Sequence, residues 1–111
     1  MTPEVKVKNR IKQIFEELGC YYFMPIGGPY SRIGVPDFIG CIDGLYIAIE
    51  AKAGKNKATA LQLRELEKVR QCGGLALVVD DSNIDSLKAQ IDEWRRREWR
   101  SEEHTSELQS H

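Results

Sequence analysis

The stretch that most constrains how this chain can fold runs from Gly34 to Lys52, GVPDFIGCIDGLYIAIEAK. Asp43-Gly44 lies between two β-rich apolar runs, which is a strong signal for a hairpin with a two-residue turn. A turn of this length fixes the register, because the residue numbers of every cross-strand pair then have the same sum. That register places Asp37 directly opposite Glu50 on the neighbouring strand.

Asp37, Glu50 and Lys52 are expected on one face of the hairpin, because side chains alternate between the two faces of a strand. Directly opposed residues have Cβ atoms about 4.5–5.5 Å apart, so two carboxylates placed there repel each other. Mg²⁺ or Mn²⁺ would convert this repulsion into ligation, since both prefer oxygen ligands. Two carboxylates and a lysine around one point suit metal-assisted attack of water on a phosphate. The alternative is a hairpin whose charged end frays into solvent, because a short acid-x-Lys string is common.

Length and composition indicate one globular domain: the chain has 111 residues, of which 41% are hydrophobic and 30% charged. No apolar run approaches the roughly 20 residues of a membrane span, and no signal-peptide pattern opens the chain. The cysteines, Cys20, Cys41 and Cys72, lie apart from one another in apolar contexts. They are expected to be buried free thiols in a reducing compartment, and not a disulfide or zinc framework.

The segment from Arg100 to His111, RSEEHTSELQSH, has no apolar period and resembles the translation of a common sequencing-library adapter. We therefore expect a domain over residues 1–99 and an artefactual polar tail over 100–111, with a natural polar tail as the alternative. Residues 1–99 hold 15 basic and 14 acidic side chains, a net charge of +1, and no histidine. Histidine-based acid–base or zinc chemistry is thus excluded in that range.

The first expected element is a helix that ends at Gly19. Thr2 serves as its N-cap and Pro3 as its first helical residue. Apolar residues recur at helical spacing at Val7, Ile11, Ile14 and Leu18. Glu4 lies three residues before Val7 on the same stripe, where a first-turn acid also favours the helix dipole. The basic side chains of this helix lie largely away from the stripe and are solvated by default: Lys6, Lys8, Arg10 and Lys12.

The later elements expected from the sequence are a strand at Cys20–Met24, a Gly- and Pro-rich loop at Pro25–Gly34, a helix at Ala60–Cys72, a strand at Leu75–Val79 and a helix from Ser82 to about Trp99. Thr59 caps the middle helix, and Gln62 opens its inward stripe. A buried glutamine needs a polar partner, which the carboxylate end of the hairpin could supply through a metal-bound water; a solvent-facing glutamine is the alternative. The strand–helix–strand order implies a right-handed crossover to a parallel neighbour. Ser82–Asp85 resembles a capping box.

Pro36-Asp37 followed by Glu50-Ala51-Lys52 resembles the PD-(D/E)xK nuclease motif, and the resemblance extends to the VRR-NUC (virus-type replication-repair nuclease) family. That family's pattern is matched by GGPYSRIGVPDFIG, then IAIEAK, then a glutamine-bearing helix, then Gly-Gly before a last strand. The match spans most of residues 4–79 in the right order. It implies an α/β fold with a restriction-endonuclease-like core in the order αβββαβα, with a mixed sheet flanked by helices.

The resemblance also implies an activity, the metal-dependent hydrolysis of DNA phosphodiester bonds, with Mg²⁺ or Mn²⁺ as cofactor. The implied metal ligands are Asp37, Glu50, the carbonyl of Ala51, and Glu4. The implied catalytic residues are Asp37, Glu50, Lys52 and Gln62. In these roles Lys52 orients or helps deprotonate the attacking water and stabilises phosphorane charge, while Gln62 positions that water or a ligand.

Two segments beside the motif are expected to contact DNA, and their residues are Tyr30, Ser31, Arg32, Lys55 and Lys57. The first segment combines glycines, which allow close backbone approach, with a hydroxyl and a planar guanidinium that can bind a phosphate. The second is a polar, basic connection that follows the motif lysine. An ordinary solvated connection is the alternative for each.

The implied partner is branched DNA, a four-way junction or a flap, bound by a homodimer. Resolving a junction needs two symmetric cuts, and a two-fold dimer supplies two sites. The aromatic side chains available for the dimer contact are Tyr21, Tyr22, Trp94 and Trp99; packing inside one subunit is the alternative. A nuclease of this kind is expected in the cytoplasm, which is that of the host cell if the chain is phage-encoded.

Two other functions stay open. A nuclease-like module would hold branched DNA without cutting it, although Asp37, Glu50 and Lys52 are all present. A small structural or regulatory α/β protein would use neither metal nor DNA. The near-neutral charge of residues 1–99 is compatible with that function, because strong non-specific DNA binders are usually more basic.

Overall fold

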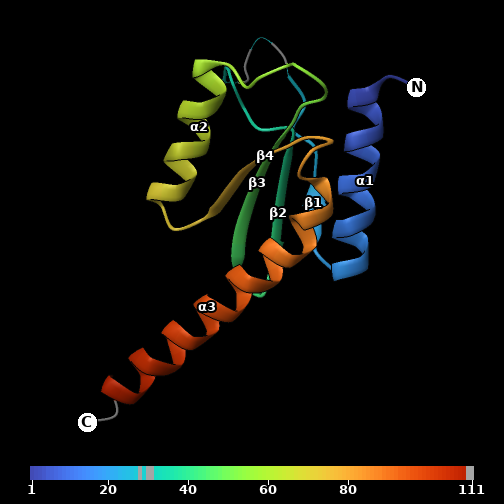
Figure 1. Ribbon diagram of the computed structural model, residues 1–111. Helices are drawn as coiled ribbons and strands as arrows, with labels where there is room; N and C mark the ends of the chain where they lie inside the picture. Colours follow the sequence, from blue (N-terminus) through green and yellow to red (C-terminus); the bar gives the residue numbers. More distant parts are fainter. Residues whose placement is uncertain (28, 30–31, 110–111) are drawn as a thin grey trace.

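The structure is a computed structural model that describes residues 1–27, 29 and 32–109, with side chains as far as residue 98. Its elements are α1 (Pro3–Leu18), β1 (Tyr21–Phe23), β2 (Phe38–Ile42), β3 (Leu45–Ala51), α2 (Ala60–Gln71), β4 (Leu75–Val79), the 3-10 turn η1 (Ile84–Ser86) and α3 (Leu87–Gln109) (Figure 1). This is the predicted αβββαβα order with one short turn added before α3. The predicted fold class is confirmed.

The strands form one four-stranded mixed sheet in the order β1-β2-β3-β4. The cross-strand pairs of the β2–β3 hairpin, all as predicted, are Ile42–Leu45, Cys41–Tyr46, Gly40–Ile47, Ile39–Ala48 and Phe38–Ile49. Asp43 and Gly44 have φ of 52° and 79°, the left-handed backbone that a type I′ turn requires. β3 and β4 run parallel, as the crossover through α2 predicts. Asp37, one residue before this ladder, therefore stands at the open end of the hairpin.

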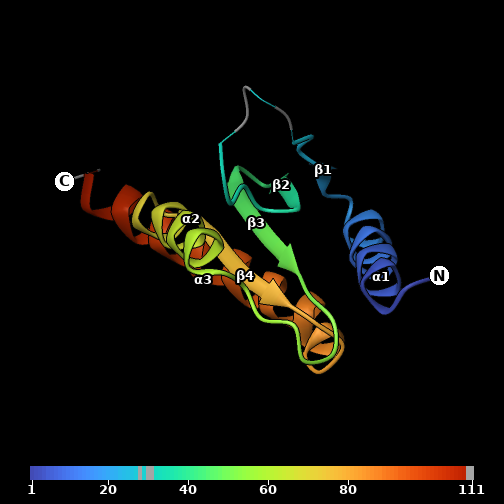
Figure 2. The same cartoon turned by 90° about the horizontal axis from the view of Figure 1, so that it is seen from above.

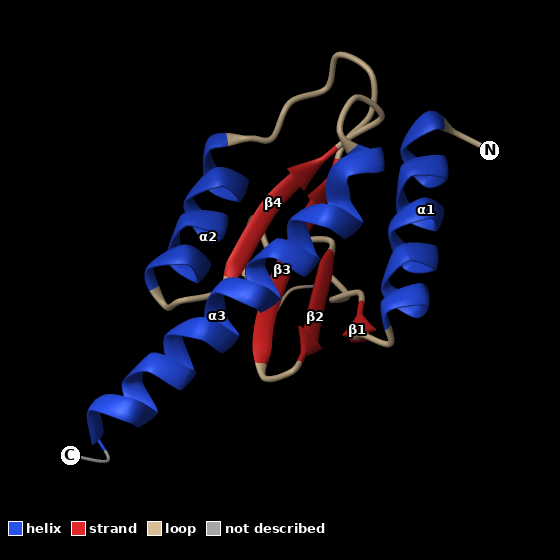
Figure 3. Cartoon of the chain, turned by 60° about the horizontal axis from the view of Figure 1, so that its bottom comes forward, coloured by secondary structure: helices blue, strands red, loops and turns tan. Residues whose placement is uncertain are grey.

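The helices cover the two faces of the sheet unequally. α1 and α3 pack on one face, where Phe15, Ile49 and Leu87 belong to one cluster of buried side chains. α2 packs on the other face, where Leu66 meets Ala48 in a smaller cluster. Figure 2 shows α1 and α2 on opposite sides of β3, and Figure 3 shows α3 running across the sheet. On this second face Ile39 of β2 still packs against the α2 cluster, whereas Cys41 and Tyr21, farther along the sheet, are exposed.

That uncovered part of the sheet changes the prediction about the cysteines. All three are free thiols, but only Cys20 is buried, and Cys41 and Cys72 are exposed. Cys41 pairs with Tyr21 on β1, away from α2, and Cys72 is the C-cap residue of α2 itself. The expectation of buried thiols is therefore wrong for Cys41 and Cys72.

The first helix begins and ends as predicted. The Thr2 hydroxyl accepts a hydrogen bond from the Val5 N–H at 3.2 Å, Pro3 is the first helical residue, and Gly19 ends the helix with φ of 70°. The predicted apolar stripe is confirmed, and Phe15 is buried beside it. The buried residues of the helix are Val7, Ile11, Ile14 and Phe15. α1 thus presents one apolar side to the sheet.

The capping box predicted at Ser82 does not form. The Ser82 hydroxyl donates to Asp80 Oδ1 at 2.6 Å, and the Asn83 side chain accepts from the Asp80 N–H and donates to the Val78 carbonyl. These side chains are engaged by the end of β4, so none of them is left to cap a helix, and the chain enters α3 through the 3-10 turn. Local competition for the same donors is the reason for the error.

The predicted end of the last helix near Trp99 is also wrong, since α3 continues to Gln109. Residues 100–109 contain no Gly or Pro that would stop a helix, and they include the helix formers Glu, Leu and Gln. The division into a domain over 1–99 and an artefactual tail stays a prediction. In the described part of the chain, no helix is long and apolar enough to cross a membrane.

Candidate active site

Asp37 and Glu50 meet at the open end of the hairpin, where β2 begins and β3 ends. The main-chain N–H of Ala51 donates to Asp37 Oδ2 at 2.8 Å, which holds the aspartate against the end of β3. The two carboxyl groups are close enough for the charge of Asp37 to act on the protonation of Glu50. The juxtaposition predicted from the hairpin register is therefore present.

Glu50 is a buried carboxyl group with one oxygen left over. Only 2% of the residue is exposed. Its Oε1 accepts from Gln62 Nε2 at 2.9 Å, but its Oε2 is buried and has no hydrogen-bond partner among the described residues. Burial, and after it the charge of Asp37, raise the pKa of Glu50 to about 8. At neutral pH this group therefore keeps a proton unless a cation takes the place of that proton.

Gln62 connects the first turn of α2 to this carboxyl group. Its Oε1 accepts from the Thr59 N–H at 2.8 Å, and the Thr59 hydroxyl accepts from the Gln62 N–H at 3.2 Å, which completes a capping box. Since the cap fixes the amide oxygen, the amide nitrogen is aimed at Glu50. The sequence predicted that a bound water would join the two side chains, whereas the contact in the structure is direct.

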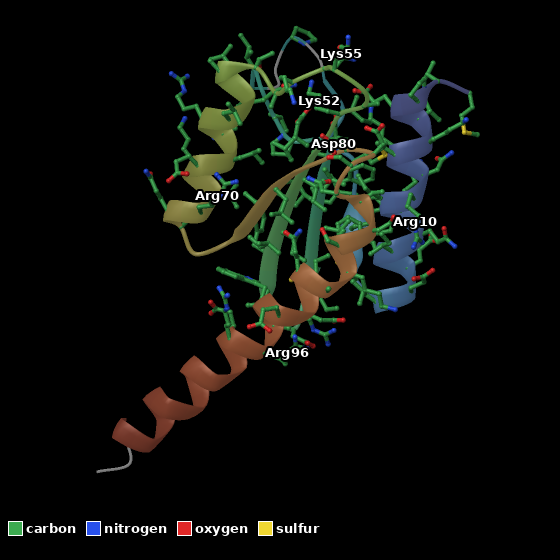
Figure 4. All side chains as sticks on the ribbon, in the orientation of Figure 1. Arg10, Lys52, Lys55, Arg70, Asp80 and Arg96 are labelled. Carbon is green, nitrogen blue, oxygen red and sulfur yellow. The ribbon has the colours of Figure 1, made fainter. Side chains whose placement is uncertain are left out.

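Lys52 places an ammonium group beside the two carboxyl groups. Its Nζ lies 3.8 Å from Glu50 Oε1, and its side chain is 15% exposed. The Lys52 N–H donates to the Val79 carbonyl at 2.9 Å, so β4 holds the residue just beyond the end of β3. Figure 4 shows Lys52 and Lys55 at the same end of the molecule. The acid-x-Lys string is thus ordered, and its charged end does not fray into solvent.

Glu4 lies apart from the carboxyl pair, and Lys8 stands between them. Lys8 Nζ is 3.7 Å from Glu4 Oε2 and 3.9 Å from Asp37 Oδ1. Within residues 1–27, 29 and 32–98, no group of three or more His, Cys, Asp or Glu side chains could hold a metal ion. Sequence reasoning assigned Lys8 to the solvated side of the helix. Its i, i+4 spacing from Glu4 is the signal that could have placed it at the site.

The donor set at the open end nevertheless fits a divalent cation. Among the described residues, Glu50 offers a buried oxygen without a hydrogen-bond partner, and the Asp37 oxygen that does not accept from Ala51 lies 3.9 Å from Lys8 Nζ. Carboxylate oxygens are the donors that Mg²⁺ and Mn²⁺ prefer. A cation there would favour the ionised form of Glu50. The assignment of Asp37, Glu50, the Ala51 carbonyl and Glu4 as ligands remains a prediction.

Comparison with known proteins finds solved structures that this chain resembles. No protein-family model matches the chain, and no curated protein matches it. Among solved structures, a VRR_NUC domain matches with a TM-score of 0.65 and 28% identity, over 78% of this chain and 95% of that one. The resemblance to the VRR-NUC family is confirmed. Hjc, a Holliday junction resolvase from the archaeal hyperthermophile Archaeoglobus fulgidus, matches with a TM-score of 0.54 and 21% identity, over 68% of this chain and 66% of that one.

The residues predicted to contact DNA are only partly placed in this VRR-NUC-like fold. Tyr30 and Ser31 lie outside the described residues. Arg32 is exposed and donates to Glu65 Oε1 on α2 at 3.0 Å. Lys55 and Lys57 are exposed on the connection between β3 and α2. The structure therefore places three of the five side chains, and their contact with DNA remains a prediction.

Gly34 supports the candidate site in a way that sequence reasoning missed. Its φ is 82°, and a Cβ atom there would lie 2.8 Å from the Leu61 carbonyl oxygen. Glycine alone combines this backbone conformation with such close approach. The loop before β2 is therefore seated directly on the first turn of α2, the turn that carries Gln62.

Proposed function

We propose that the chain is a divalent-metal-dependent nuclease that hydrolyses DNA phosphodiester bonds. The observation that carries the proposal is the buried, unpartnered Oε2 of Glu50 next to Asp37. Two carboxyl groups placed in this way are unfavourable without a counter-charge, so the arrangement is understandable as a binding site. The similarity to a VRR_NUC domain and to a Holliday junction resolvase supports the same reaction class.

In the proposed site, Asp37 and Glu50 would hold Mg²⁺ or Mn²⁺, with the Ala51 carbonyl and Glu4 as further ligands. The bound ion would supply positive charge against the phosphate and lower the pKa of the attacking water. Glu4 would be the outermost ligand, because Lys8 stands between it and Asp37.

Lys52 and Gln62 would prepare the site for hydrolysis. The Lys52 ammonium is 3.8 Å from Glu50 and largely withdrawn from solvent, so its charge acts strongly at short range. It would orient the attacking water and stabilise phosphorane charge. Gln62 would fix one oxygen of Glu50 through its 2.9 Å hydrogen bond, which leaves the other oxygen for ligation.

The proposed substrate is branched DNA, such as a four-way junction or a flap, and the proposed assembly is a homodimer. Similarity to the Hjc resolvase supports the substrate, and two symmetric cuts would need two sites. Of the aromatic residues predicted for the dimer contact, Tyr21 is 73% exposed. Tyr22 instead stacks on Phe15 with ring centroids 5.2 Å apart, Trp94 is half-buried, and Trp99 lies beyond the described side chains.

Incubation with labelled linear, nicked, flap and four-way DNA in Mg²⁺, Mn²⁺ or EDTA tests the proposed activity. Branched substrates should be cut when metal is present and left intact in EDTA. Cleavage that persists in EDTA, or no cleavage of any substrate with either metal, would contradict the proposal.

Light scattering coupled to size exclusion tests the assembly. If the protein is a monomer in solution and remains a monomer when bound to a four-way junction, symmetric cleavage of junctions is excluded. The proposed substrate would then be a flap or a DNA end.

A DNA-binding module without cleavage is the second candidate. Lys8 and Lys52 favour it, because their ammonium groups lie 3.9 Å from Asp37 and 3.8 Å from Glu50 and offer the carboxyl pair two positive charges without a metal. In that case, binding to branched DNA is the same with EDTA as with Mg²⁺, and no substrate is cut. The same set of incubations, followed by a binding measurement, separates the two candidates.

A further inference from the structure

An open groove lies beside the candidate active site, on the face of the sheet that α2 covers only in part. Its volume is about 530 Å³, which is within the range of small-ligand sites. Apolar side chains from the loop before β2, from β2 and β3, and from α2 make up much of its lining, and charged side chains from the loop and α2 complete it. Its lining includes Arg32, Val35, Ile39, Tyr46, Lys68 and Val69.

Tyr46 supplies an aromatic ring to this groove. The residue is 47% exposed, although it lies in the middle of a sheet. A Cβ atom at Gly74 would lie 3.3 Å from Tyr46 Cδ1 and 2.7 Å from Val69 Cγ1, so the lack of a side chain there makes room for both residues. The ring therefore rests against the start of β4 with part of its surface left open.

The groove leads to the candidate carboxylates. A second hollow, of about 290 Å³, shares Arg32, Val35 and Pro36 with the groove and reaches Asp37. Tyr46 and Glu50 lie on the same face of β3, four residues and therefore about 13 Å apart along the strand. A DNA strand with its phosphate at Asp37 would thus have a nearby nucleotide beside Tyr46.

The charges at the groove favour a polyanion. Arg32 and Lys68 both approach Glu65 Oε1, at 3.0 and 3.8 Å, so two cations share one carboxylate. The side chain of Arg32 is 67% exposed, which leaves its planar guanidinium accessible to a phosphate. The groove therefore combines an apolar, aromatic lining with a net positive charge from these three side chains.

We propose that the groove holds an unpaired base of the DNA strand being cut, stacked on Tyr46, with adjacent phosphates against Arg32 and Lys68. This inference rests on the proposed nuclease function and specifies its substrate. An aromatic ring stacks on any of the four bases, whereas a base in a duplex is already stacked and cannot enter a pocket unless it is flipped out. The groove thus selects DNA that has an unpaired nucleotide next to the scissile phosphate.

The test compares Tyr46→Ala and Tyr46→Phe with a matched control, Phe23→Ala. Phe23 is an aromatic residue that is 49% exposed and pairs with Ile39 in the same sheet, but it does not line the groove. Fluorescence anisotropy in EDTA measures binding without cleavage, on a labelled flap and on a fully paired duplex. Tyr46→Ala should weaken flap binding by about five-fold or more, as expected for one lost base–aromatic stack, and leave duplex binding unchanged. Tyr46→Phe and Phe23→Ala should bind both substrates as the wild type does.

A second readout follows the base itself. A 2-aminopurine placed in the flap should lose fluorescence when it stacks in the groove, and Tyr46→Ala should abolish that loss. Equal weakening on flap and duplex, an equal effect of Phe23→Ala, or unchanged binding of a flap with abasic nucleotides would overturn the inference. Binding that depends on Tyr46 but is never followed by cleavage with Mg²⁺ or Mn²⁺ would refute the nuclease function. It would still support the groove as a binding site for an unpaired base. No binding to either DNA would overturn both.

Discussion

The two ends of the β2–β3 hairpin both carry acidic side chains, but in opposite environments. At the turn, Asp43 is 64% exposed, and its Oδ2 lies 2.7 Å from Arg95 Nη2 and accepts from Arg95 Nε at 2.9 Å. At the open end, Glu50 is withdrawn from water beside Asp37, and one of its oxygens has no partner among the described residues. The Asp43 carboxylate at the turn is paired within the chain, whereas Glu50 at the open end needs a proton or a cation to balance its charge. The comparison separates an acid that is paired within the fold from acids that are available to a ligand.

The largest expected difference between the two ends is in cleavage. Asp37→Asn and Glu50→Gln should each abolish it, because each removes a charge needed to hold the metal, and both should keep or raise stability by relieving repulsion. Asp43→Asn, the matched change at the turn, should cut DNA as the wild type does. Cleavage rates and melting temperatures of these variants check the prediction. Near-wild-type cleavage by either open-end variant would mean that the site is assigned wrongly.

Lys52 should separate chemistry from binding at the open end. Lys52→Ala should lower the turnover rate by about 10²-fold or more, as for a lost acid–base or charge-stabilising group, while DNA affinity changes much less. Lys88→Ala, which removes an ammonium that pairs with Glu17 in the last turn of α1, is the control for charge alone. If DNA binding disappears together with activity, Lys52 is a backbone anchor and has no catalytic role.

The open end should also give the metal-free protein a dependence on pH. The pKa of Glu50 is raised from 4.5 to about 8, so between these values the folded state keeps a proton that the unfolded state has lost. The favourable contribution is complete below the unfolded pKa and is lost as pH rises through the folded pKa. Stability in EDTA should therefore fall from about pH 5 to about pH 9, and Glu50→Gln should reduce that fall by about 5 °C or more in melting temperature. Parallel profiles for the two proteins would contradict the burial of an ionisable group at this position.

The smallest expected effect is at the turn. Arg95→Ala removes the ion pair with Asp43 and should lower the free energy of unfolding by about 0.2–1 kcal/mol, as for other exposed pairs, with no change in cleavage. Urea unfolding measures the difference. A much larger loss would show that Arg95 holds α3 to the hairpin through contacts beyond this ion pair.

The open end could be predicted because its signals are local. Asp43-Gly44 sets the register of the whole hairpin, so Asp37 and Glu50 could be placed without knowing where any other element lies. Thr59 and Gln62 are three residues apart, and their capping box also needs no tertiary information. In each case a short stretch of chain determines the geometry by itself.

What the sequence could not supply is how one element lies against another. The spacing of Lys8 from Glu4 puts the two side chains on one side of the helix, but the 3.9 Å approach of Lys8 to Asp37 also depends on how α1 lies against the sheet. The exposure of Cys41 depends in the same way on how far α2 extends over the sheet. At Ser82 the error was of another kind, because the end of β4 engaged a side chain that a helix could equally have used.

Gly34 holds the loop before β2 against Leu61 and so determines where the chain approaches Asp37 and β2. Before this anchor, Ile26 and Ile33 are 90% and 76% exposed, so their side chains add little to the packed interior. Insertions and substitutions near Ile26 and Ile33 can therefore accumulate at low thermodynamic cost, provided that the glycine remains. If the proposed function is correct, this segment is where a preference for one DNA shape could change while the carboxyl pair a few residues away stays the same.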